Sequence, residues 1–150
     1  MISREPFESA DAQALAQAQQ AELRGIDGRG DIGPVRVGAM FEPPDGVFLV
    51  ARAEDGAPLG CGGVARFDET RGELKRMYVV PEARGRGIGR ELLVALEAEA
   101  RALGYRGLVL ETGTAQEAAI GLYASFGYAP IPCYGPYAGQ AVSRCFEKTL

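Results

Sequence analysis

The chain of 150 residues contains no histidine, tryptophan or asparagine, and it has only three cysteines. Without histidine it lacks the commonest general base, so a Ser-His or Cys-His catalytic pair is excluded. A zinc site would need unusual ligands, because no Cys-x-x-Cys pair is present. Catalysis must therefore depend on carboxylates, tyrosine, lysine, cysteine or water, and we expect no bound metal.

Long apolar runs are also missing. No run approaches the ~20 residues that cross a bilayer, and segment 1–13 lacks the apolar region of a signal peptide. Three scattered cysteines are too few for a disulfide framework, and we expect Cys61 and Cys133 to be small, buried, reduced thiols. These patterns predict a cytoplasmic protein with no membrane partner.

The net charge of −4 is unevenly distributed. Residues 71–90 hold six basic and two acidic side chains, so this segment carries +4 and the rest of the chain −8. One concentrated basic segment in an acidic protein favours a discrete anionic ligand over nucleic acid. An RNA-binding role for the basic segment is the remote alternative, because the repeated aromatic platforms of such modules are missing.

The hydrophobic pattern predicts a single α/β (α+β) domain over residues 1–150, with a mixed central sheet flanked by helices. A helix capped by Ser9 or Asp11 should run to Arg24 and end at Gly25. Segment 25–46 has no period and should be a long loop with room for one short helix. Beyond it, the pattern predicts strands at 47–52, 58–67 and 72–80, a helix that stops at Gly104, a strand at 107–112, a helix at 115–126, and a closing hairpin of 128–133 and 143–150.

An Arg-x-x-Gly-x-Gly pattern lies between a predicted strand and the first turn of a helix. Helix N-termini present unpaired N–H groups and the positive end of the helix dipole. Glycine at alternate positions lets those N–H groups approach an anion, and the arginines add charge-assisted hydrogen bonds to phosphate. The pattern indicates a pyrophosphate-binding segment, called the phosphate cradle below, made of Arg84, Gly85, Arg86, Gly87, Ile88, Gly89 and Arg90.

The run from Glu73 to Tyr128 resembles the GCN5-related N-acetyltransferase (GNAT) family, and weaker similarity covers 47–150. Four signals occur in the family's order: a strand ending in Val-Pro, the cradle, a buried strand, and a helix end of the form Leu-Tyr-x-x-x-Gly-Tyr. The resemblance implies a GNAT-like domain with acetyl-coenzyme A (acetyl-CoA) as cosubstrate. It implies acetyl transfer to the primary amine of a small molecule by direct attack. The alternative is a non-catalytic acyl-CoA-binding sensor on the same fold.

The resemblance also implies how the cosubstrate is held. In this family the strand before the cradle splays from its neighbour, and its main chain binds the pantetheine arm. That implies main-chain contacts from Met77, Tyr78 and Val79. Many members place an asparagine near the start of the following short helix, where it contacts a pantetheine amide. This chain has no asparagine, and Gln116 offers a similar amide there.

Two catalytic roles follow from the resemblance. Tyr123 matches the family's tyrosine near the thioester sulfur, where a phenol can protonate the leaving thiolate; from helical spacing alone it would be a core aromatic. Glu73 lies six residues before Val79, the spacing at which histone-acetyltransferase-like members keep their general base. A solvated strand-edge carboxylate is the alternative for Glu73, and Glu111 or water is the alternative base.

Strand alternation gives an expectation about the acceptor. It places Glu73, Lys75 and Met77 on one face, unless a bulge shifts the register. A lysine beside the amine site would favour an acceptor that pairs its amine with an anionic group, and Arg52 and Arg66 on adjacent strands could add to that pocket. We therefore expect a small, amino-acid-like acceptor and a monomeric or homodimeric protein.

Overall fold

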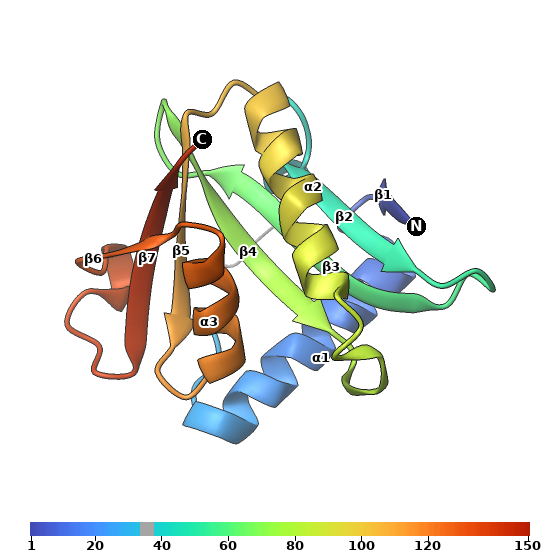
Figure 1. Ribbon diagram of the computed structural model, residues 1–150, viewed down its shortest axis with the longest axis horizontal. Helices are drawn as coiled ribbons and strands as arrows, with labels where there is room; N and C mark the ends of the chain where they lie inside the picture. The colour runs from blue at the N-terminus through green and yellow to red at the C-terminus, as the bar shows by residue number, and fades with distance from the viewer. Residues whose placement is uncertain (34–37) are drawn as a thin grey trace.

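A mixed sheet forms the centre of the computed structural model, which describes residues 1–33 and 38–150 (Figure 1). Within these ranges the sheet has seven strands in the order β1-β2-β3-β4-β5-β7-β6. Only β4 and β5 pair in parallel, and the other described neighbours are antiparallel. The strands are β1 Ile2–Arg4, β2 Val47–Arg52, β3 Pro58–Arg66, β4 Arg71–Val79, β5 Gly107–Gly113, β6 Ala129–Ile131 and β7 Ser143–Thr149.

Helices cover both faces of the sheet. In Figure 1, α2 and α3 lie in front of the sheet and α1 behind it. The helices are α1 Ala10–Asp27, α2 Ile88–Ala102 and α3 Glu117–Ser125, with short 3-10 helices η1 Gly38–Phe41, η2 Pro81–Ala83 and η3 Gly135–Tyr137. The α/β class and the mixed sheet are as predicted. No helix in the described ranges is long and apolar enough to cross a membrane.

Helix α1 begins as predicted but ends later. The Ser9 hydroxyl accepts a hydrogen bond from the Ala12 N–H at 3.3 Å. The prediction that Gly25 ends the helix is wrong, because the helix continues to Asp27. Gly28 adopts the left-handed conformation that closes the helix, and its N–H donates to Arg24 O. An interior glycine costs a helix only about 1 kcal/mol, so Gly25 by itself does not stop it.

The sheet separates two apolar cores. One lies between the sheet and the helices α2 and α3, and it contains Leu92, Leu93, Leu96 and Leu108. The other lies under α1, where Leu15 packs with Phe7, Phe41 and Phe48. Consecutive residues of β2 and of β5 are buried, so both strands are covered on both faces, which explains their continuous apolar sequences.

Strands β4 and β5 stay together for only three residue pairs. Their parallel pairing runs from Arg71 to Glu73 opposite Gly107–Val109, and no pairing is found beyond it within the described residues. Further along β4, Arg76 has a positive φ of 61°. The register of β4 against β3 also shifts between Cys61 and Gly63.

This bulge overturns the predicted alternation. Leu74 and Met77 both pack against the core under α2. The prediction that Met77 shares a face with Glu73 and Lys75 is therefore wrong. A bulge adds one residue to one strand, so every side chain beyond it changes face.

The expectation for Cys133 is also wrong, because Cys133 and Cys145 form a disulfide with 5.1 Å between their Cα atoms. The antiparallel pairing of β6 with β7 sets Ile131 opposite Cys145, which brings Cys133 within reach. Cys61 is a free, buried thiol, as expected. Burial raises the pKa of the Cys61 thiol to about 12, so this cysteine is a poor nucleophile at neutral pH.

Candidate active site

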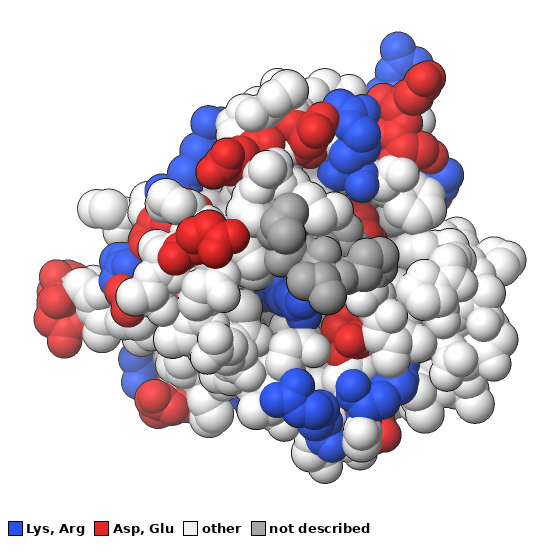
Figure 2. All heavy atoms as spheres, turned by 180° about the vertical axis from the view of Figure 1, so that it is seen from behind, with Lys and Arg blue, Asp and Glu red and all other residues white. Residues whose placement is uncertain are grey.

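A cavity of about 760 Å³ lies where β4 and β5 part. Its lining comes from α1, the loop after it, β4, the phosphate cradle, β5 and α3. Seen from the side of α1, the molecule is hollowed at its centre, and basic side chains lie inside the hollow (Figure 2). The predicted site residues that line the cavity are Met77, Tyr78, Val79, Arg84, Gly85, Gly87, Ile88, Gly89, Arg90, Gln116 and Tyr123. Arg86 and Glu73 are outside this lining.

The backbone of the phosphate cradle is shaped by left-handed glycines. Gly85 and Gly87 have φ angles of 80° and 84°, and a Cβ added at either would meet nothing within 4 Å. Gly87 is also the N-cap of α2 and offers no side-chain cap. The N–H groups of residues 85–90 find no acceptor in the part of the chain that is described. A row of unpaired donors at a helix N-terminus suits a pyrophosphate, and the cradle therefore fits the phosphates of a coenzyme A thioester.

The three arginines of the cradle point in different directions. Arg84 Nε donates to Val79 O at 2.9 Å, and its Nη2 lies 2.7 Å from Glu22 Oε1. Arg90 lies over the Phe126 ring and donates to the Ser125 hydroxyl at 3.3 Å. The remaining arginine, Arg86, turns back to Glu82 O. Because these contacts are exposed, each arginine can exchange its partner for a phosphate at small cost.

The main chain of β4 faces the cavity beyond its pairing with β5. Met77 O accepts a hydrogen bond from Gln19 Nε2 at 3.4 Å, and Val79 O accepts from Arg84. Gln19 and Arg84 both line the cavity, so the edge of β4 that β5 leaves unpaired borders it. Such an edge can pair with an extended, amide-bearing ligand as a neighbouring strand would.

Tyr123 and Gln116 reach the cavity from α3. Tyr123 is buried against Tyr128, with ring centroids 5.7 Å apart. Burial raises the pKa of Tyr123 well above its usual value, so its hydroxyl stays protonated and can donate. Gln116 stands at the N-cap of α3, and its amide approaches the backbone of Gly113.

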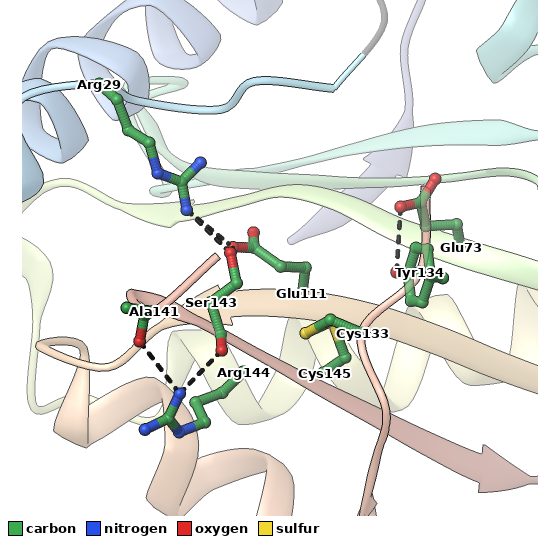
Figure 3. The surroundings of a disulfide bond; sticks show 9 residues. All are labelled: Arg29, Glu73, Glu111, Cys133, Tyr134, Ala141, Ser143, Arg144 and Cys145. Atoms are coloured by element: carbon green, nitrogen blue, oxygen red, sulfur yellow. Dashed lines mark hydrogen bonds and ion pairs between the residues drawn. A yellow bond between two sulfur atoms is a disulfide. The ribbon is translucent and has the colours of Figure 1, made fainter. Parts of the chain in front are cut away.

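The two candidate bases lie in different surroundings, on either side of the disulfide (Figure 3). Glu73 is only 4% exposed and accepts a hydrogen bond from the Tyr134 hydroxyl at 3.1 Å. Glu111 lines the cavity and accepts from Ser143 Oγ at 2.8 Å and from Arg29 Nη2 at 3.3 Å. Burial raises the pKa of Glu111, against the opposing effect of those two donors.

An ion pair that the sequence did not indicate lies at the same end of the cavity. Lys75 Nζ is 2.6 Å from Asp31 Oδ2 and 2.7 Å from the Tyr137 hydroxyl, which itself donates to Asp31 Oδ1. Burial alone would raise the pKa of Asp31, but Lys75 and these hydrogen bonds hold it well below its usual range. Asp31 comes from the aperiodic loop after α1, where no local pattern marks it. Lys75 lies near Glu73 as expected, with 3.9 Å between Nζ and Oε2. Its charge is matched by Asp31.

Arg52 and Arg66 lie elsewhere. Arg52 pairs with Glu5 at 2.7 Å, and Arg66 with Asp45 at 3.0 Å. Neither lines the cavity. The interpretation that they belong to an anion pocket is therefore wrong.

Comparisons with known proteins agree with this geometry. The sequence model of the acetyltransferase (GNAT) family matches residues 12–128. An IAA acetyltransferase of Azospirillum brasilense is 48% identical over 108 residues, which are 71% of this chain and 70% of that protein. An L-methionine sulfoximine/L-methionine sulfone acetyltransferase of Pseudomonas aeruginosa is 34% identical over 107 residues, which are 69% of this chain and 62% of that protein.

A solved structure resembles the whole chain. A Klebsiella pneumoniae protein, provisionally named an acyl-CoA N-acyltransferase, superposes with a TM-score of 0.85 at 34% identity, covering 100% of this chain and 97% of that one. The sequence match, the named relatives and the shared fold all indicate the same family. The chain belongs to the GNAT family of acetyltransferases and is an acyltransferase.

Proposed function

We propose that this enzyme transfers the acetyl group of acetyl-CoA to the primary amine of a small molecule. The observation that carries the proposal is the continuity of one cavity. It joins the unpaired N–H groups of the phosphate cradle, the open edge of β4, Tyr123 and the carboxylate of Glu111. Cosubstrate binding, a proton donor and a proton acceptor are then available along a single path.

Each segment of the cavity has a role in holding the cosubstrate. The cradle N–H groups bind the pyrophosphate, and Arg84 and Arg90 add charge. The main chain of Met77 and Val79 pairs with the amides of the pantetheine arm. Gln116 supplies the amide contact for which the chain has no asparagine.

The chemistry requires two proton movements. The uncharged amine nitrogen forms a bond to the thioester carbonyl carbon, and the C–S bond breaks. The Tyr123 hydroxyl gives its proton to the sulfur, which makes the thiolate a better leaving group. Glu111 takes the proton that the nitrogen must lose, directly or through a water molecule, and solvent restores the proton of Tyr123.

We assign the base role to Glu111 because it lines the cavity and its raised pKa makes it a stronger base than an exposed carboxylate. Glu73 is the second candidate, since Lys75 and Tyr134 place it at the same end of the site. Its burial behind these side chains favours a positioning role.

A thiol-release assay tests the proposed function. The enzyme should release free coenzyme A from acetyl-CoA in proportion to an added amine, and the acetylated amine should appear in equal amount. Calorimetry should show acetyl-CoA binding with or without the amine. Binding without thiol release across amino acids, aliphatic amines, polyamines and aromatic amines would instead support a non-catalytic acyl-CoA sensor.

A further inference from the structure

Arg76 lies at the end of the cavity that Lys75 and Glu111 line, called the acceptor end below, and its guanidinium makes no hydrogen bond to the described residues. Its side chain is 14% exposed. Its Nε and Nη1 atoms are both buried and have no hydrogen-bond partner among the described residues. The side chain also belongs to the cavity lining. A buried guanidinium with unused donors is costly to keep, unless something that binds in the cavity satisfies it.

Asp31 does not satisfy Arg76. Its Oδ2 is 3.7 Å from Arg76 Nη1, which is beyond hydrogen-bonding distance. The two Asp31 oxygens are already engaged by Lys75, the Tyr137 hydroxyl and the Gly33 N–H. Asp31 therefore lowers the electrostatic cost of burying Arg76 and leaves the donors of the guanidinium available.

The neighbouring cations already use most of their hydrogen-bond donors on other groups of the protein. Lys75 is matched by Asp31 at 2.6 Å. Arg29 donates to Glu111, Ser143 and Gly30 and is outside the cavity lining. Within the described chain, Arg29 also has one buried donor without a partner, its Nε, but Arg76 has two such donors, and of these two arginines only Arg76 lines the cavity.

Backbone geometry points to the same residue. Arg76 is the one non-glycine residue of the described chain with a positive φ. It lies at the β4 bulge, where the parallel pairing with β5 has already ended. Left-handed backbone is unfavourable for arginine, and such strain gathers at ligand-binding positions. In this protein the residue with the left-handed backbone is one whose side chain lines the cavity.

We infer that Arg76 binds a carboxylate of the acceptor, so that the acceptor is a small amino carboxylate. A guanidinium presents parallel N–H donors that match the two oxygens of a carboxylate. In this arrangement the acceptor carboxylate lies on Arg76 and its amine lies toward Glu111, because both residues line one cavity. This inference rests on the proposed acetyl transfer and names the acceptor class for that reaction.

The test uses matched acceptors. The twenty L-amino acids are compared with their carboxamides and with the amines that lack the carboxyl group, by thiol release with acetyl-CoA. The best acceptors should carry the carboxylate, and their carboxamides and decarboxylated amines should fall at least tenfold in kcat/KM. Equal or better acetylation of the uncharged analogues, or of spermidine, would overturn the inference.

Variants of Arg76 separate acceptor binding from folding and from cosubstrate binding. Arg76→Gln should raise KM for the preferred amino acid at least tenfold, change kcat less, and leave KM for its carboxamide unchanged. The Kd for acetyl-CoA should stay within twofold, since a larger change would place Arg76 on the cosubstrate. Arg71→Gln is the matched control, because Arg71 is on the same strand but pairs with Asp68 and Glu147 outside the cavity.

A binding measurement distinguishes this inference from the proposed function. N-acetyl-L-amino acids and their carboxamides are titrated by calorimetry into enzyme saturated with coenzyme A. Arg76 should give the carboxylates an advantage of at least tenfold in Kd that Arg76→Gln abolishes. If that advantage is present but no amine releases thiol, the proposed function fails and the carboxylate site stands. If thiol is released without any such advantage, the carboxylate site fails and the proposed function stands.

Discussion

Lys75 on β4 reaches Asp31 in the loop after α1, with 2.6 Å between Nζ and Oδ2 across 44 residues of sequence. Both side chains are largely buried, at 6% and 13% exposure. The pair fastens the loop after α1 to the acceptor end of the cavity. Lys75, which the strand alternation had predicted to lie beside the acceptor amine, is therefore already paired with a carboxylate.

Breaking this pair should destabilise the protein. Asp31→Asn leaves Lys75 charged and buried, so the free energy of unfolding should fall by about 3 kcal/mol, measured by urea denaturation at pH 7. The double variant Asp31→Asn/Lys75→Met removes both charges and should recover much of that loss. A single variant as stable as the parent enzyme would mean that the pair contributes nothing to stability.

The same pair predicts a pH dependence. Asp31 has its pKa lowered in the folded protein, so its contribution is fully present above the unfolded pKa of about 3.9. The contribution is lost as pH falls from there toward the folded pKa. The difference in unfolding free energy between the parent and Asp31→Asn should therefore shrink below about pH 4. A constant difference from pH 7 to pH 3 would contradict this assignment.

Gly87→Ala should weaken acetyl-CoA binding at least tenfold, because the left-handed turn that aims the cradle N–H groups is disfavoured by any Cβ. The matched control is Gly104→Ala at the other end of α2, which also has a positive φ and open space around it. Both variants should lose about 1–2 kcal/mol of stability. Calorimetry should find weaker acetyl-CoA binding only in Gly87→Ala, and an equal effect in both variants would assign the loss to general backbone strain.

Tyr123→Phe should lower kcat by roughly 100-fold and leave the Kd for acetyl-CoA nearly unchanged. Tyr128→Phe is the control, because Tyr128 packs on Tyr123 but donates its hydroxyl to Glu97. That variant should lose about 1 kcal/mol of stability and keep its kcat. Since burial raises the pKa of Tyr123, its ionisation should not reduce kcat below about pH 10. A Tyr123→Phe enzyme with the parent kcat would assign Tyr123 to the core alone.

Glu111→Gln should remove the acidic limb that ionisation of the Glu111 carboxyl gives to the kcat/KM profile. Because burial raises the pKa of Glu111, the parent enzyme should lose activity as pH falls toward a pKa above the usual value of about 4.3. The kcat/KM of the variant should be lower than that of the parent, and the pH dependence that remains should follow only the ionisation of the acceptor amine. If Glu73→Gln alone removes this limb, Glu73 is the base; if both variants keep it, water serves.

The disulfide predicts a thiol count. Denatured enzyme without reductant should show one reactive thiol, that of Cys61, and reduction should expose three. Cys145→Ser should lower the free energy of unfolding by about 3 kcal/mol, while Cys61 stays buried. Three reactive thiols before reduction would contradict the pairing of Cys133 with Cys145.

The sequence by itself determined the features that depend on neighbouring residues. The alternating glycines between a strand and a helix indicated the phosphate cradle, because its geometry needs only local backbone freedom and a helix N-terminus. The helix at 115–126 and the continuous apolar runs at 47–52 and 107–112 indicated the elements around it, since periodicity and burial leave direct marks on sequence. Tyr123 needed in addition the resemblance to the family, because its spacing alone fits a core position.

Only the tertiary structure decided which residues from distant parts of the chain meet. Cys133 reaches Cys145 through strand pairing, and Asp31 reaches Lys75 through a loop that has no sequence period. A single bulge at Arg76 changed the face of Met77 and left a guanidinium with unused donors in the cavity. Contacts between residues far apart in the chain depend on register and packing, and no local pattern records those.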